Sequence, residues 1–200
     1  MTTADMLREP HAIALPPPVV DESTPLMQAL RLRRSVRAFG AKALSDVVLS
    51  TLLWAGFGVN RPESGKRTAP SAHNWQEIDV YAALASGTYQ YEPAGHRLVL
   101  AVPDDLRALT GTQEFVATAP LNLVYVADFA RMDAENGNDR AFLAGADAAV
   151  IAQNVYLYAA AAGLATVVRG LIDRRALARA MGLRPQQRIV LAQSVGYPVL

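Results

Sequence analysis

The sequence predicts an α+β fold built as one domain. Segments with the apolar spacing of helices alternate with short runs of β-branched and aromatic residues, which are typical of strands. No internal repeat is present, and the composition does not change along the 200 residues, a length that suits one sizeable domain. We place an extended, proline-rich arm at residues 1–23 and a single domain at residues 24–200.

The arm and the first two helices follow from local signals. Three consecutive prolines, Pro16 to Pro18, favour an extended path and exclude a helix or a central strand. Thr24 followed by Pro25 is a typical helix start, with a capping hydroxyl and then proline in the first turn. A second helix is expected from Ser45 through Phe57.

The middle of the chain contains a long loop between the second predicted helix and the first predicted strand of the domain. Residues 58–76 are rich in turn residues, and a loop of this length inside a domain is usually functional or disordered. Residues 77–84 alternate like a strand. Residues 88–102 then read as two strands that turn through residues 93–95.

The second half continues the alternation and ends on a strand. A helix over 141–162 is apolar nearly all round, which predicts burial in the fold or in a subunit interface, and Gly163 is its expected stop. The other predicted elements are a short helix within 103–111, a buried strand over 119–128, a polar loop at 131–140, a strand over 164–170, a helix capped by Asp173, and a strand over 187–198.

Composition excludes several classes of function. The 19 basic and 18 acidic residues leave a net charge of +1, so nothing general favours nucleic acid or anionic lipid. The chain has no cysteine and three dispersed histidines, so we expect no metal site. Residues 1–20 lack the basic region and apolar run that are typical of a signal peptide, and the apolar run at 155–168 is too short to span a membrane. We therefore expect a cytoplasmic protein with no membrane partner.

A basic cluster around one serine, "RRSVR", is the first candidate site. On a continued helix, Arg33 and Arg37 would extend the apolar stripe of Leu26 and Leu30. Arginines at the end of a helix often only complement its dipole. The alternative is a phosphate site, because guanidinium groups and the Ser35 hydroxyl supply charge-assisted donors. Periodicity alone leaves both interpretations open.

Two further segments carry polar groups that a ligand could use. Asn74 and Gln76 flank Trp75 in the long loop, where local turn hydrogen bonds are the simpler explanation. Arg169 and Gly170 follow an apolar strand, so the arginine would face solvent or an anion and the glycine would let a flat ligand approach. The standard P-loop and Rossmann glycine motifs are not matched.

Taken together, these segments resemble the FMN-dependent nitroreductase superfamily. The resemblance rests on "RRSVRAF" at 33–39, "APSAHNWQEIDVY" at 69–81, "GLATVVRGLID" at 163–173 and "VLAQSVGYP" near the end, in the family's order. It implies a three-layer α/β/α sandwich with a mostly antiparallel mixed sheet, an extensive homodimer, and FMN bound at the interface. Some features are also similar to the SagB-type dehydrogenase branch.

The resemblance also implies which residues hold the cofactor. Those matching the phosphate and ribityl segment are Arg33, Arg34, Ser35 and Arg37. Those matching the loop that reaches the flavin from the other subunit are Pro70, Ser71, Ala72, Asn74 and Gln76. Those matching the segment beside the isoalloxazine, where a backbone N–H faces flavin N5, are Val168, Arg169 and Gly170. No catalytic side chain is assigned.

The implied activity is ping-pong transfer of electrons from NAD(P)H through FMN to a flat acceptor such as a nitroaromatic or quinone. The alternatives are a SagB-like flavin dehydrogenase or oxidase acting on an organic substrate, and a non-catalytic FMN-binding protein. Two departures from the family pattern stand out. Arg169 replaces a frequent glutamate, and no basic residue follows "GYP", a contact for which Arg67 or Arg188 are candidate substitutes.

Overall fold

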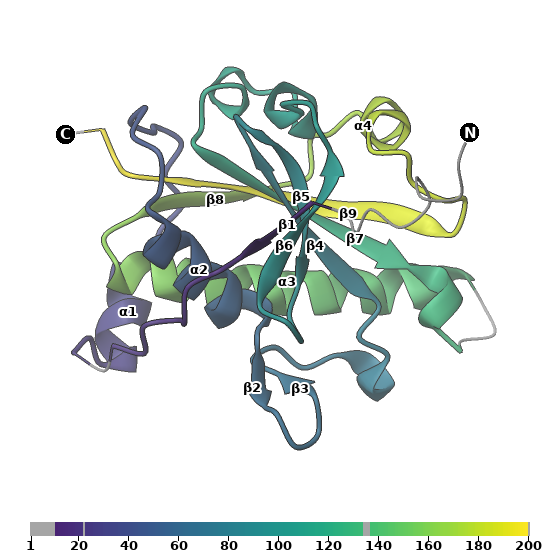
Figure 1. Cartoon of the computed structure of the whole chain (residues 1–200), viewed down its shortest axis with the longest axis horizontal. Helices are drawn as coiled ribbons and strands as arrows, with labels where there is room; N and C mark the ends of the chain where they lie inside the picture. Colours follow the sequence, from purple (N-terminus) through teal and green to yellow (C-terminus); the bar gives the residue numbers. More distant parts are fainter. Residues whose placement is uncertain (1–10, 22, 134–136, 200) are drawn as a thin grey trace, which may run out of the picture.

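The computed structural model describes residues 11–21, 23–133 and 137–199. Its centre is a seven-stranded sheet in the order β1-β6-β5-β4-β7-β9-β8 (Figure 1). The expected mostly antiparallel sheet is confirmed, and every pairing among the described strands is in fact antiparallel. The strands are β1 (Ala12–Ala14), β4 (Ile78–Leu84), β5 (Gly87–Glu92), β6 (Arg97–Val102), β7 (Leu121–Asp128), β8 (Ala165–Arg169) and β9 (Gln187–Gly196).

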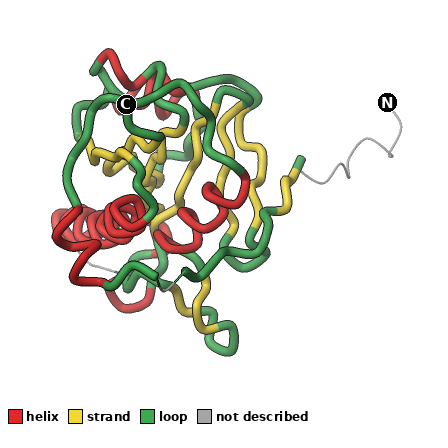
Figure 2. The backbone as a smooth tube through the Cα atoms, turned by 90° about the vertical axis from the view of Figure 1, so that its left-hand side faces the viewer, coloured by secondary structure: helices red, strands yellow, loops and turns green. Residues whose placement is uncertain are grey.

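Helices cover both faces of the sheet, which gives the three layers. The long helix α3 runs across one face together with α1 and α2, and α4 lies on the other (Figures 1 and 2). The helices are α1 (Leu26–Leu32), α2 (Asp46–Phe57), α3 (Gly137–Ala161) and α4 (Arg174–Ala180), with 3-10 turns η2 (Ala72–Asn74), η3 (Arg107–Thr110), η4 (Glu114–Val116) and η5 (Phe129–Arg131).

The two faces of β7 explain why the sheet is covered on both sides. All eight of its residues are buried. Leu123 and Tyr125 pack with Ile151 of α3, whereas Val124 and Val126 pack with Leu177 of α4. Because successive side chains of a strand point to opposite faces, this continuous apolar run needs a helix layer on each side.

Most predicted elements form close to the expected boundaries. The Ser45 side chain accepts a hydrogen bond from the Val48 N–H and caps α2, and Asp173 caps α4 in the same way through Ala176. Gly163 has a φ of +69° just after α3, the left-handed conformation that glycine adopts without strain. The arm remains extended through Pro16 to Pro18, with β1 at the sheet edge.

The long loop carries more structure than its composition indicates. A two-stranded hairpin, β2 (Val59–Arg61) with β3 (Lys66–Arg67), projects from the domain beside η2 (Figure 1). The start of α1 also differs from expectation. The helix begins at Leu26, with Pro25 as its N-cap and no side-chain cap. Among the described residues, no helix combines the length and apolarity needed to cross a membrane.

Candidate functional site

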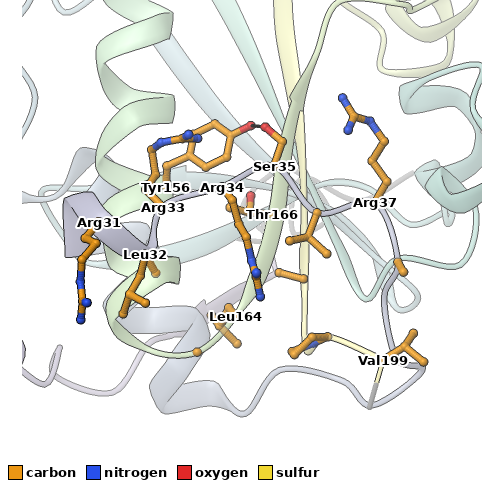
Figure 3. Close-up of a pocket in the computed structure, with 16 residues that line it drawn as sticks. Arg31, Leu32, Arg33, Arg34, Ser35, Arg37, Tyr156, Leu164, Thr166 and Val199 are labelled. Carbon is orange, nitrogen blue, oxygen red and sulfur yellow. Dashed lines mark hydrogen bonds between the residues drawn. The ribbon is translucent and has the colours of Figure 1, made fainter. Parts of the chain in front are cut away.

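A pocket of about 950 Å³ opens between the end of α1, the end of α3 and the start of β8 (Figure 3). Its walls come from two stretches that are distant in sequence, within 31–38 and 156–166, and from the C-terminal tail. The lining residues are Arg31, Leu32, Arg33, Arg34, Ser35, Val36, Arg37, Ala38, Tyr156, Ala160, Gly163, Leu164, Ala165, Thr166, Pro198 and Val199. The whole predicted phosphate segment therefore lies in one cavity.

The helical prediction for this segment is wrong. α1 ends at Leu32, and residues 33–38 run extended along the outer edge of β8. The Val36 N–H donates to the Thr166 carbonyl at 2.9 Å, and the Gly40 N–H donates to the Tyr197 carbonyl at 2.8 Å. These long-range hydrogen bonds replace the helical ones, so Arg33 and Arg37 do not continue the stripe of α1.

Tyr156 of α3 joins two of the predicted binding segments. Its hydroxyl lies 2.8 Å from Ser35 Oγ and accepts a hydrogen bond from the Val168 N–H at 2.9 Å. The Arg33 guanidinium lies 5.2 Å from the centre of the same ring. Sequence reasoning missed Tyr156 because it sits within an apolar helical run, where an aromatic residue is usually core.

The hydrogen bonds of Tyr156 allow the Ser35 hydroxyl to donate to a ligand. The tyrosine oxygen accepts from Val168, and its own O–H can donate to Ser35 Oγ. The proton of the Ser35 hydroxyl is then free to donate into the pocket. Ser35 is exposed, so a ligand can reach it.

The charge of the pocket is one-sided. Arg31, Arg33, Arg34 and Arg37 line it, and the lining contains no acidic residue. Within the described part of the chain, none of the four forms an ion pair. The guanidinium groups of Arg34 and Arg37 point in different directions (Figure 3). Unpaired guanidinium groups of this density suit a phosphate ligand, toward which the side chains would turn.

The loop carrying Pro70, Ser71, Ala72, Asn74 and Gln76 forms a separate cavity beside the β2–β3 hairpin. The Ala72 N–H donates to Asp147 Oδ2 at 2.8 Å, and the Gln76 N–H donates to Ser71 Oγ at 3.0 Å. His73, Asn74 and Gln76 all have positive φ, which is unusual for residues other than glycine. Such strained backbone is concentrated at functional sites.

α3 holds these two regions on opposite sides. Asp147 anchors the loop through Ala72, and Tyr156 anchors the arginine segment through Ser35. The two anchors are nine positions apart, which corresponds to about 14 Å along a helix and about half a turn around it. The loop and the arginine segment are therefore not brought together within one chain.

Arg169 does not face solvent or either cavity. Its side chain is 4% exposed and enters the interior behind β8. It donates to Ser194 Oγ at 3.1 Å, to the Thr110 carbonyl at 2.8 Å and to Asn122 Oδ1 at 3.1 Å. All of these acceptors are neutral, and burial lowers the pKa of the guanidinium to about 10. Gly170, by contrast, is exposed.

A buried carboxyl next to the loop was not predicted from the sequence. Glu77 is fully buried, and its two carboxyl oxygens make no hydrogen bond with the described residues. Burial raises the pKa of Glu77 to about 7, and the negative charge of Asp147 acts in the same direction. A glutamate that follows a loop and precedes a strand gives no sequence signal of this burial.

Neither suggested substitute for the C-terminal cation lines the arginine pocket. Arg67 lies in the hairpin cavity, and Arg188 donates to the Pro185 carbonyl at the start of β9. Arg31, which sequence reasoning left out, does line the pocket. The tail itself contributes Pro198 and Val199.

The three-layer fold and the arginine-lined pocket can now be compared with those of known proteins. The model of the nitroreductase family matches residues 30–197, so the chain belongs to this family.

Individual relatives agree with that assignment. A Methanocaldococcus jannaschii protein named among the nitroreductases is 33% identical over 160 residues, covering 74% of this chain and 80% of its own. A similarly named structure from Ralstonia eutropha JMP134 is 45% identical with a TM-score of 0.90, covering 94% of this chain and 90% of its own. A Desulfovibrio desulfuricans structure, described as a nitroreductase in complex with FMN, is 25% identical with a TM-score of 0.64. The match covers 88% of this chain and 87% of its own.

Proposed function

We propose that this protein is an FMN-dependent oxidoreductase that transfers electrons from NAD(P)H to a flat acceptor such as a nitroaromatic or a quinone. The observation that carries the proposal is the pocket lined by four arginines and no acid, with Ser35 held in place by Tyr156. Its volume is within the range of ligand sites, and its donors fit the dianionic phosphate of FMN. Family membership supports a flavin oxidoreductase.

A homodimer would complete the site. The loop at 70–76 and the arginine segment are anchored on opposite sides of α3, so a flavin touching both needs the loop of a second copy. α1 also exposes apolar side chains beside the pocket: Leu26 is 64% exposed, Met27 is 73% exposed and Leu30 is 43% exposed. An apolar helix face of this kind is typical of a subunit interface.

The residues of the chain would have distinct roles around the cofactor. Arg33, Arg34 and Ser35 would hold the phosphate. Two backbone groups of β8 point away from β9. The Thr166 carbonyl accepts from Val36 in the segment 33–38, and the Val168 N–H donates to the Tyr156 hydroxyl. Because backbone groups alternate along a strand, the Gly170 N–H is the next donor expected at this free edge. We assign it the contact with the flavin ring.

The flavin would supply the redox chemistry, accepting a hydride at its N5 atom and passing electrons on. The protein would bind it, leave one face accessible, and place N–H donors and cationic groups where negative charge develops on reduction. No nucleophilic side chain is required, which is compatible with a chain that has no cysteine.

Three measurements test the proposal. The purified protein should acquire flavin absorbance with FMN, and anaerobic NADH or NADPH should bleach it. Bound flavin that stays oxidised with both nucleotides would exclude the proposed donor. Replacement of Arg33 or Arg34 by alanine should weaken FMN binding about tenfold or more, since a charge-assisted hydrogen bond contributes about 1.5–3 kcal/mol. Arg175→Ala, at an exposed position of α4, is the matched control.

A further inference from the structure

A second cationic cavity lies beside the loop at 70–76, in the projecting hairpin of β2 and β3 (Figure 1). It has a volume of about 210 Å³. Three of its lining residues are the hairpin cations Arg61, Lys66 and Arg67. Four more, Pro70, Ser71, Asn74 and Gln76, belong to the predicted flavin loop.

The hairpin cations have no acidic partner in the cavity. The lining contains no aspartate or glutamate, and none of the three cations forms an ion pair within the described residues. Glu63, in the turn of the hairpin, is exposed and does not line the cavity. Three like charges on a short hairpin repel one another, and a bound anion would relieve this repulsion.

Arg67 is fixed in position by its neighbours. Its guanidinium lies 4.3 Å from the centre of the Phe57 ring, and its Nε donates to Gln76 Oε1 at 2.9 Å. Gln76 in turn donates to the Gly65 carbonyl at 3.3 Å, which joins the loop to the hairpin. Arg67 Nη1 is buried and has no hydrogen-bond partner among the described residues. The guanidinium also borders a neighbouring cavity that Asp79 and Glu92 line, but it forms no ion pair with either carboxylate. A buried donor without a partner is costly, and an anion bound beside the guanidinium would remove this cost.

We propose that the hairpin cavity binds a phosphate group of a ligand held at the flavin loop. The inference rests on the proposed function for the identity of that ligand. The cavity is too small for a whole nucleotide, and guanidinium and ammonium donors suit a phosphate dianion. The group would be a phosphate of the nicotinamide donor or, shared with the arginine pocket of the partner subunit, the 5′-phosphate of FMN.

The test uses the full chain with Lys66→Gln and Arg67→Gln, and with Arg175→Gln as the matched loss of one positive charge outside the cavity. The Lys66 side chain is exposed, so Lys66→Gln is expected to fold even if Arg67→Gln does not. Dissociation constants are measured for FMN, riboflavin and NADP⁺ by titration. The shift in unfolding temperature caused by inorganic phosphate is measured separately, without any flavin.

The outcomes separate the two sources of phosphate. A roughly tenfold weaker affinity for FMN but not for riboflavin assigns the site to the flavin phosphate. A similar loss for NADP⁺ alone assigns it to the donor. If the wild type binds no flavin, the proposed function fails. A phosphate-induced stabilisation that is smaller in Lys66→Gln but unchanged in Arg175→Gln still supports the cavity. Unchanged values for all four probes in Lys66→Gln would overturn the inference.

Discussion

Ser35 Oγ and the Tyr156 hydroxyl lie 2.8 Å apart although 121 positions separate them in the chain. The contact ties the arginine segment to α3, and the same hydroxyl accepts from the Val168 N–H of β8. One side chain thus fixes the relative position of two segments that a flavin would contact.

Removing the Tyr156 hydroxyl should loosen both segments. In Tyr156→Phe, the Val168 N–H and the Ser35 hydroxyl lose their shared partner, and we expect a loss of about 1–3 kcal/mol in the free energy of unfolding. FMN affinity should fall as well, because Ser35 is no longer held. Urea unfolding and flavin titration measure the two effects.

Tyr158→Phe serves as the control for binding, since it removes a hydroxyl from the same helix but not from the arginine pocket. Equal losses of FMN affinity in both variants would show that Tyr156 has no special role in the site.

Glu77 should make stability fall as the pH rises. Its pKa is raised from 4.5 to about 7 in the folded chain, so between these values the folded state binds more protons than the unfolded state. The stabilisation is complete below about pH 4.5 and is lost as the pH rises through 7. Its contribution to the free energy of unfolding is on the order of 1–3 kcal/mol.

Glu77→Gln should be more stable than the wild type at pH 8, and the two proteins should differ less at pH 5. Denaturant unfolding at both values checks this, and a constant difference would refute it.

His96, which contacts the N-terminal arm, should make the folded state less stable as the pH falls. Its Nδ1 lies 2.8 Å from the Tyr91 hydroxyl, and its Nε2 lies 2.7 Å from Ser50 Oγ, which donates to the Pro16 carbonyl. Burial lowers the pKa of His96, so its contribution to stability is present above pH 6.5 and is lost as the pH falls through its folded pKa. An NMR titration should place this imidazole below 6.5. A higher value for His96 would contradict the prediction.

Gly111 should be irreplaceable because of Arg169. A Cβ at Gly111 would lie 2.1 Å from Arg169 Nη1, although the extended φ of 179° would suit any residue. Gly111→Ala must therefore displace a buried guanidinium from its acceptors, and we expect a loss of about 2–4 kcal/mol in unfolding free energy. Thermal and urea unfolding measure this loss.

Gly145→Ala is the control. Nothing lies within 4 Å of the added carbon, so this variant should be neutral or stabilising. Similar behaviour of the two variants would disprove the steric argument.

The sequence by itself determined the elements whose signals are local. Ser45 and Asp173 cap the helices that follow them, Gly163 ends α3, and the apolar run of β7 is buried on both faces. These features depend on hydrogen bonds and side-chain spacing within a few residues, so a single chain reveals them.

Only the tertiary structure decided how the candidate site is assembled. The segment after Leu32 leaves the helix because Val36 pairs with Thr166, and Arg169 turns inward because Thr110, Asn122 and Ser194 meet it there. Glu77 is buried and Tyr156 becomes a shared hydrogen-bond partner for the same kind of reason. Each of these outcomes depends on contacts between residues distant in sequence, which compete with local preference and which no local pattern encodes.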